Sequence, residues 1–331
     1  MTRADVAAGI LWTGATLYAL FGGADFGAGF WDLIAGDAER GKRPRALIQR
    51  SLTPVWEANH VWLIFILVVL WTAFPEAFGA VMSTLYVPLA LAAFGIVLRG
   101  AGFAFRKPIH SLPVQRAMGA TFALSSVLTP FFMGTVVGAI AAGNVPPGGG
   151  DAFSSWLRPL PLLVGAMFVA SGAYLAAVFL VGDARRPGAE DLERYFVRRA
   201  LAAALVAGAL AAAGLLALHS EARYVFDRLT DQGLPLVILS VACGIVLLGV
   251  LWRGGRRPLR PLAGGAVAAV IWGWGVAQFP YLLPTSLKIT ESAAPPDTLG
   301  AVIVVFIAAA VLVLPALGLL FWLSQRQLLG E

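Results

Sequence analysis

Long apolar runs recur along the whole length of this chain, and they constrain its fold more than any other feature. A helix of about 20 apolar residues crosses the ~30 Å hydrocarbon core of a bilayer. The chain is 59% hydrophobic and only 13% charged, whereas soluble domains carry roughly 25% charged residues. We therefore expect an all-α polytopic membrane protein with a single transmembrane domain over residues 1–331.

The apolar runs predict nine transmembrane helices. Their ranges are Val6–Ile34, Pro54–Phe74, Phe78–Phe105, Met118–Ala142, Pro161–Val181, Ala200–Leu218, Leu234–Trp252, Leu262–Pro284 and Leu299–Leu323. The stretches between them are short, so no soluble domain interrupts the membrane domain. A multi-pass protein of a bacterial cytoplasmic membrane fits this pattern.

Basic residues alternate between the predicted loops and so predict the orientation. One set of loops and the tail hold Arg40, Lys42, Arg43, Arg45, Arg50, Arg106, Lys107, Arg116, Arg185, Arg186, Arg194, Arg198, Arg199, Arg253, Arg256, Arg257, Arg260 and Arg326. The other side has only Arg3, Arg158, Arg223, Arg228 and Lys288. Cytoplasmic loops carry the excess of Lys and Arg, so we expect the N-terminus outside and the C-terminus in the cytoplasm. The same asymmetry accounts for the net charge of +6 without a nucleic-acid partner.

Two ionisable residues inside predicted spans, Asp25 and Arg99, are candidates for function because a charge in hydrocarbon is costly. Each lies about 10–13 Å from the predicted cytoplasmic end of its helix, at 1.5 Å per residue. Their similar depth suggests a structural Asp25–Arg99 ion pair. The alternative for Arg99 is that its side chain extends to the cytoplasmic surface. Asp32, nearer the end of the first span, is expected to be a solvated end residue.

The predicted second span begins with a cluster of polar and aromatic side chains. Trp56, Glu57, Asn59 and His60 precede a fully apolar run. Glu57 and His60 share one helix face at i, i+3 spacing. Glu57 either caps the helix start, where the helix dipole favours an acid, or belongs to a proton-conducting or quinone-adjacent cluster.

Few residues are suited to ligating a metal or haem. Only His60, His110 and His219 are present, in a span start and in loops on opposite sides, and Cys243 is the single cysteine. Multi-haem and haem–copper centres need several ligands at matched depth. We therefore expect no metal site, no bound cofactor and no catalytic residue in this chain alone.

Four segments carry a family resemblance. They are Gly22–Gly29 (GGADFGAG), Trp56–Leu63 (WEANHVWL), Leu98–Phe103 (LRGAGF) with Arg106, and Phe279–Ser286 (FPYLLPTS). With them the chain resembles subunit II of cytochrome bd-type quinol oxidases, the subunit without haem. Some members have Asp-Gly where this chain has Glu57 and Ala58.

The resemblance implies two four-helix bundles plus one extra helix. It also implies a heterodimer with subunit I, which would hold haem b and haem d and bind the quinol substrate. Such a complex couples quinol oxidation to oxygen reduction to water in the respiratory chain. Small accessory subunits are further possible partners of the complex, and lipid and quinone would surround the complex in the membrane.

In this family subunit II stabilises subunit I and contributes to cytoplasmic proton uptake, and the acid of the second motif, here Glu57, is the position associated with the path. Asp25, His60, Asn59, Trp56 and Arg99 are further proton-path or interface candidates. Two alternatives stay open. One is a secondary transporter with a site at Asp25 and Arg99, and the other is a purely structural partner subunit.

Overall fold

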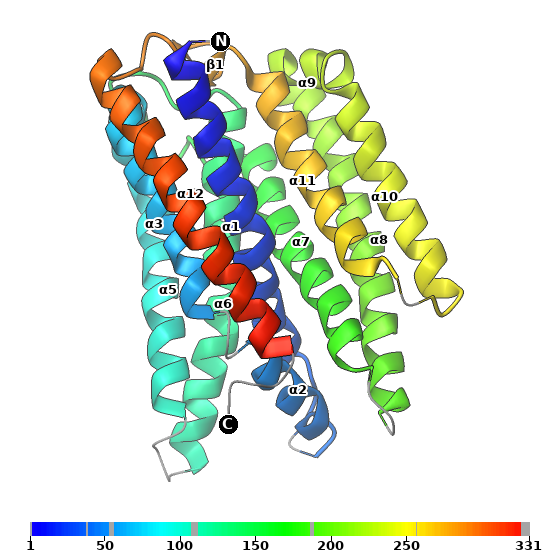
Figure 1. Cartoon of the computed structure of the whole chain (residues 1–331). Coiled ribbons are helices and arrows are strands. Elements are labelled where there is room, and N and C mark those ends of the chain that lie inside the picture. The colour runs from blue at the N-terminus through cyan, green and yellow to red at the C-terminus, as the bar shows by residue number, and fades with distance from the viewer. Residues whose placement is uncertain are drawn as a thin grey trace.

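The computed structural model describes residues 2–37, 39–52, 56–106, 112–185, 189–255 and 257–325. Within these ranges, the side chains of residues 52, 56–59, 103, 106, 112–113, 115–116, 314, 317 and 320–325 are not described. The protein is almost entirely helical (Figure 1). The observed elements are α1 (Arg3–Leu33), α2 (Lys42–Leu52), α3 (Trp56–Ala73), α4 (Pro75–Thr84), α5 (Tyr86–Arg106), α6 (Leu112–Ala141), α7 (Pro159–Asp183), α8 (Glu190–Glu221), α9 (Arg223–Thr230), α10 (Leu234–Trp252), α11 (Leu259–Gln278), β1 (Tyr281–Leu283), β2 (Leu287–Lys288) and α12 (Pro296–Gln325).

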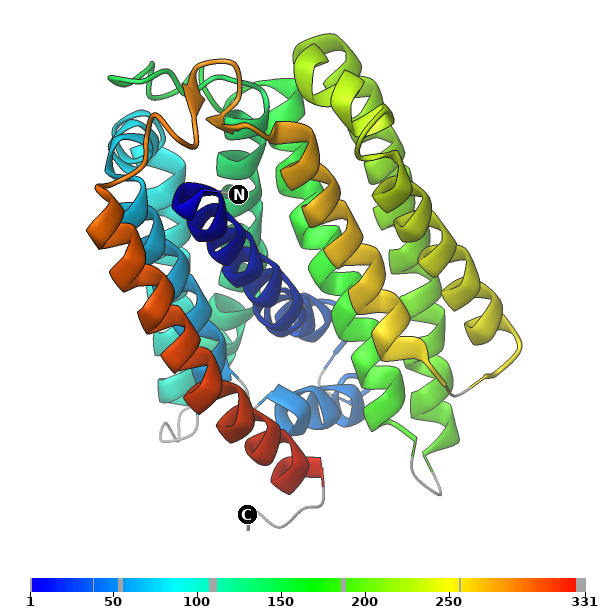
Figure 2. The ribbon, with the colours of Figure 1, turned by 45° about the horizontal axis from the view of Figure 1, so that its top comes forward.

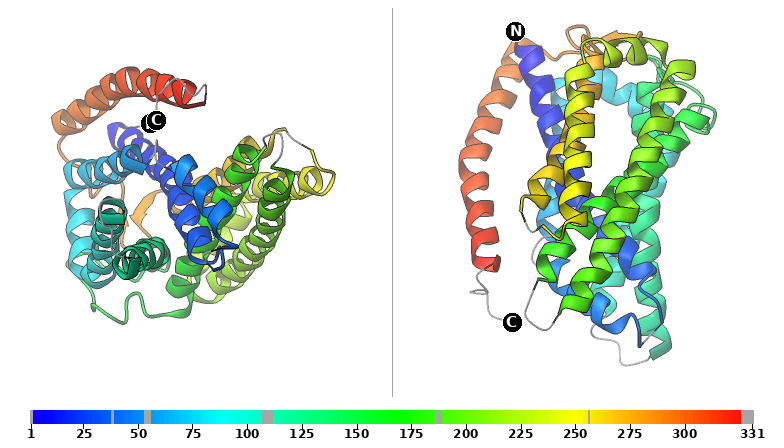
Figure 3. Two further views of the ribbon diagram at one scale, coloured as in Figure 1. Left: turned by 90° about the horizontal axis from the view of Figure 1, so that it is seen from below. Right: turned by 90° about the vertical axis from the view of Figure 1, so that its right-hand side faces the viewer.

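The long helices form two neighbouring groups (Figures 1 and 3). The first contains α1, α3, α5 and α6, and the second contains α7, α8, α10 and α11. The groups meet where α7 packs against α1 and α6. α12 lies along the outside of the first group, against α1 and α3. This grouping agrees with two four-helix bundles plus one extra helix.

The helices are long and apolar enough for a multi-pass membrane protein. In the described part of the chain, seven helices could cross a membrane, or eight if α3 and α4 form one bent span. α5 is apolar but shorter over its described length. The predicted count of nine therefore remains a prediction, although the start of α1 and the end of α12 lie at opposite ends of the molecule as an odd count requires (Figure 1).

The third predicted span, Phe78–Phe105, is wrong as a single helix. α4 is bent by 119° from α3 and ends at Thr84, and α5 begins at Tyr86. Pro88 explains the break between α4 and α5, because a proline lacks a backbone N–H and its ring clashes with the carbonyl four residues earlier. That carbonyl belongs to Thr84.

The eighth predicted span, Leu262–Pro284, is also too long. α11 ends at Gln278, and the chain then forms a short antiparallel hairpin in which Tyr281 pairs with Lys288 and Leu283 with Leu287. Leu282, Leu283 and Leu287 are buried in the same apolar core as the α3–α4 corner. α11 ends just before Phe279-Pro280, because the residue that precedes a proline is disfavoured in helical geometry.

Glycines allow α1 and α7 to approach closely. A Cβ at Gly27 would overlap the backbone carbonyl of Gly172, and a Cβ at Gly172 would lie 2.7 Å from the carbonyl oxygen of Gly23. Small residues at such crossings let helix backbones meet in membranes. The glycines of the first motif therefore join the two helix groups.

The short helix α2 lies across the end of the bundle where α1 finishes (Figure 2). It carries four basic residues, Lys42, Arg43, Arg45 and Arg50. It contacts α1 and α7. This end of the molecule is the one that loop charge predicts to be cytoplasmic.

Candidate functional site

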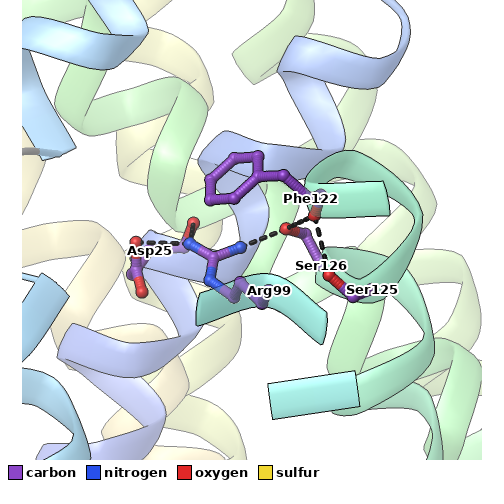
Figure 4. Close-up of polar contacts among 5 residues, drawn as sticks. All are labelled: Asp25, Arg99, Phe122, Ser125 and Ser126. Atoms are coloured by element: carbon purple, nitrogen blue, oxygen red, sulfur yellow. Dashed lines mark hydrogen bonds and ion pairs between the residues drawn. The ribbon is translucent and has the colours of Figure 1, made fainter. Parts of the chain in front are cut away.

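Asp25 on α1 and Arg99 on α5 form a buried ion pair (Figure 4). Arg99 Nη2 lies 2.6 Å from Asp25 Oδ1 and also donates to the Asp25 carbonyl oxygen at 3.1 Å. The two side chains are 1% and 4% exposed. The predicted pair is thus confirmed, and the alternative in which Arg99 extends to the cytoplasmic surface is wrong.

The α6 helix completes the surroundings of Arg99. Arg99 Nη1 donates to Ser126 Oγ, and Ser126 Oγ in turn donates to the carbonyl of Phe122 at 2.6 Å. The guanidinium carbon lies 4.4 Å from the ring centroid of Phe122 and 4.9 Å from that of Phe26. Cation–π contacts of this kind gain strength where water is excluded, so the two rings and the hydroxyl help to offset the cost of burying the cation.

Gly29 explains why the pair can form at this crossing. A Cβ there would overlap Ser126 Oγ and would lie 2.9 Å from Arg99 Nη1. The glycine-rich motif therefore supplies both the acid and the space for its partner. α1, α5 and α6 each contribute one polar group to the same point.

Two other side chains lie within electrostatic range of the ion pair. His60 on α3 and Tyr18 on α1 each interact electrostatically with both Asp25 and Arg99. Tyr18 also donates from its hydroxyl to Met133 Sδ at 3.6 Å. The structure thus brings His60, Asp25 and Arg99 from the predicted set into one electrostatic neighbourhood.

Within the described residues, two polar atoms of the pair have no hydrogen-bond partner. They are Asp25 Oδ2 and Arg99 Nε. Thr129 Oγ1, one turn beyond Ser126 on α6, is a third such atom. Buried polar atoms in proteins are normally hydrogen-bonded to protein or to ordered water, so this region offers polar groups that water can satisfy.

The remaining predicted site residues lie at the start of α3. The helix begins at Trp56, one residue before Glu57. The side chains of Trp56, Glu57 and Asn59 lie outside the described part of the structure. Their roles therefore stay predictions, and only His60 of this cluster can be placed.

Sequence reasoning missed the contribution of α6. Ser125, Ser126 and Thr129 form a polar patch inside an otherwise apolar span, and this patch was the available signal. Phe122 carried no signal, because one aromatic residue in a membrane helix resembles any other. Only the packing of α6 against α5 reveals which faces meet.

Asp32 is a second correction. The expectation of a solvated end residue is wrong, because Asp32 is only 5% exposed and lies 3.5 Å from Arg45 Nε. Arg45 also donates to the carbonyls of Gly36 and Asp37 at 2.7 and 3.0 Å. The chain turns back after α1, and α2 covers the carboxylate.

Side chains that could ligate a metal ion are scattered in the described part of the chain. No group of three or more His, Cys, Asp or Glu side chains gathers there. His219 contacts Arg223 and stacks edge-on against Phe226 at 4.9 Å, at the far end of α8 from the Asp25–Arg99 pair.

Comparisons with known proteins agree with the fold and with the family resemblance. Residues 4–324 match the family described as cytochrome bd terminal oxidase subunit II. A cytochrome bd ubiquinol oxidase subunit 2 of Bacillus subtilis is 22% identical over 80% of this chain and 77% of its own length. The cytochrome bd-I ubiquinol oxidase subunit 2 of Escherichia coli is 23% identical over 83% and 80%. A chain in the structure of bd oxidase from Geobacillus thermodenitrificans superimposes with a TM-score of 0.79 and 26% identity, over 98% of both chains.

Proposed function

Because this chain belongs to the cytochrome bd terminal oxidase subunit II family, we propose that it is the haem-free subunit of a quinol oxidase and supplies part of its cytoplasmic proton-uptake path. The haems and the quinol site would belong to subunit I. The reaction of the complex would couple quinol oxidation to the reduction of oxygen to water. The family assignment argues against the transporter alternative.

α3 has an exposed apolar face that a partner subunit could cover in place of lipid. Val61, Ile64, Val68 and Trp71 of α3 are each at least half exposed, at 55%, 60%, 51% and 64%. Their spacing of three and four residues places them on one face of the helix. The solved relative is a chain of a bd oxidase, and the curated relatives are each named as subunit 2 of a cytochrome bd ubiquinol oxidase. A haem-bearing subunit I on this side of the molecule agrees with both observations.

The buried Asp25–Arg99 pair is the observation that carries the proton-path proposal. It places charged groups and unpartnered polar atoms inside the helix bundle. His60, within electrostatic range of the pair, lies one turn after Glu57 on α3. A carboxylate at the start of α3 can take a proton from cytoplasmic water. His60, Asp25 and Arg99 can then hold water molecules through which the proton moves inward.

Within this path the two acids have different roles. Asp25 and Arg99 form a net-neutral unit, which holds water dipoles and polar groups in fixed positions. We place proton exchange at Glu57, the acid of the second motif at the start of α3, and positioning at Asp25–Arg99. A purely structural role for the pair is the second candidate, and it is favoured by the ion pair, the serine and the two aromatic rings around Arg99.

The test is the Glu57→Gln substitution in the purified oxidase complex. The amide keeps the shape of the side chain but cannot exchange a proton, so oxygen consumption should fall by about 10²-fold or more, the usual range for a lost proton-transfer group. Haem content should be unchanged. Glu76→Gln is the matched control, because Glu76 is an exposed first-turn acid at the opposite end of the bundle. Normal turnover in Glu57→Gln would remove Glu57 from the path.

A further inference from the structure

The end of the bundle around α2 and the start of α8 holds an excess of arginines. Four acids there already have a partner. Asp191 pairs with Arg43, Glu193 with Arg185 at 2.8 Å, Asp183 with Arg260 at 2.5 Å, and Asp32 with Arg45 at 3.5 Å. These pairs tie α8, α2, α7, α11 and α1 together at this end.

Three arginines of α8 have no acidic partner among the residues that the structure describes. They are Arg194, Arg198 and Arg199. Arg194 donates only to the carbonyl of Glu190 at 3.3 Å, and Arg199 to that of Tyr195 at 3.4 Å. A guanidinium has five N–H donors, so most of theirs remain available.

These three arginines border an open cavity on the surface of α8, and every residue that lines it belongs to this helix. The cavity has a volume of about 310 Å³ and is bordered by Asp191, Arg194, Tyr195, Arg198 and Arg199. Arg199 forms its inner wall, with its guanidinium 3.3 Å from the centroid of the Tyr195 ring and its Nε buried. Asp191, the one acid of the cavity, is already paired with Arg43. The cavity is therefore strongly positive.

An apolar face of α8 continues from this cavity along the membrane. Exposed positions at helical spacing along this face are Arg194, Arg198, Ala202, Leu205, Ala209, Ala212 and Leu216. Leu205 and Leu216 are 64% and 75% exposed. Spacings of three and four residues keep these positions on one side of the helix, so a cationic end and a shallow apolar track share one face.

We propose that this cavity binds the phosphate of an anionic phospholipid, with an acyl chain along the exposed face of α8. Arginine matches a phosphate with paired N–H donors, and basic pockets beside membrane helices bind anionic headgroups. The site selects anionic over zwitterionic lipid, because a choline or ethanolamine headgroup carries a positive charge that would lie close to the three arginines. Its contacts hold α8 to α2 through the Arg43–Asp191 pair at the cavity edge.

The experiment uses the purified oxidase complex, stripped of lipid in detergent and titrated with phosphatidylglycerol, with binding followed by native mass spectrometry. Phosphatidylcholine and inorganic phosphate are titrated in parallel. The variant Arg194→Gln/Arg198→Gln should bind the first phosphatidylglycerol about thirtyfold more weakly, the effect expected for two basic residues at an anionic headgroup. Arg194→Lys/Arg198→Lys keeps the charge and should lose much less.

The matched control is Arg40→Gln/Arg253→Gln, which removes two charges from exposed arginines at the same end that do not line the cavity. It should bind phosphatidylglycerol as the unaltered complex does. Equal loss in both double variants, equal binding of phosphatidylcholine, or equally tight binding of inorganic phosphate would each overturn the proposal. If the double glutamine variant fails to assemble, the single variants Arg194→Gln and Arg198→Gln, each compared with Arg40→Gln, test the same site.

Discussion

Asp25 and Arg99 form an ion pair in the interior of the first helix group, where their side chains are only 4% and 1% exposed. The cost of burying these two charges is offset locally by the ion pair, by the Ser126 hydroxyl and by the rings of Phe26 and Phe122. Such a set is sensitive to the loss of one member, because the charge that remains would be buried alone.

Arg99→Met should therefore destabilise the complex by about 3–5 kcal/mol, the usual cost of leaving a buried charge unpaired. The double variant Arg99→Met/Asp25→Asn removes both charges and should recover much of that loss. Thermal unfolding of the detergent-solubilised complex measures both effects. If the losses from Arg99→Met alone and Asp25→Asn alone simply add up in the double variant, the two side chains do not depend on each other.

The pair could be predicted from sequence, whereas its surroundings could not. Charge in an apolar span and matched depth identified Asp25 and Arg99. Ser126 and Phe122 became visible only through the packing of α6, because no pattern within one helix says which face meets a neighbour. Asp32 was mistaken for a solvated residue for the same reason, since the return of α2 over the end of α1 is a tertiary feature.

At the scale of elements, backbone proximity between α1 and α7 joins the two helix groups. Gly23, Gly27 and Gly172 form this crossing. The interior is close-packed, so a single added methyl group at the crossing must move one helix.

Gly27→Ala should lower the stability of the complex by about 1–3 kcal/mol through overpacking. Gly9→Ala is the matched control on the same helix, because a Cβ at Gly9 would meet no atom within 4 Å. Thermal unfolding of the two variants side by side measures the difference. If they unfold at the same temperature, the α1–α7 contact does not limit stability.

Prolines decide two element boundaries that hydropathy did not show. Pro280 lies just after the end of α11, although the predicted span ran on to Pro284. The break at Thr84 follows from Pro88 by the same chemistry, but the apolar run is continuous there and hides it. Hydropathy measures how long a chain stays apolar and not whether it stays straight, so the 119° bend between α3 and α4 could not be read from it.

For the whole molecule, two helix groups and a peripheral α12 give an architecture that matches a solved bd oxidase chain over 98% of both lengths. Polar chemistry is concentrated in the first group, where α1, α3, α5 and α6 surround the ion pair. Unpaired arginines are concentrated on the second, at the start of α8. This division suggests that one group serves proton uptake and that the other anchors the subunit in lipid.

The most direct test of the account is to purify the chain under mild conditions from its own membranes, through an affinity tag, and to record the absorbance spectrum of the product. The account predicts that a larger subunit co-purifies, that haem b and haem d bands accompany it, and that the product consumes oxygen when supplied with quinol. An intact, folded chain that elutes alone, without haem absorbance or quinol oxidase activity, would contradict it.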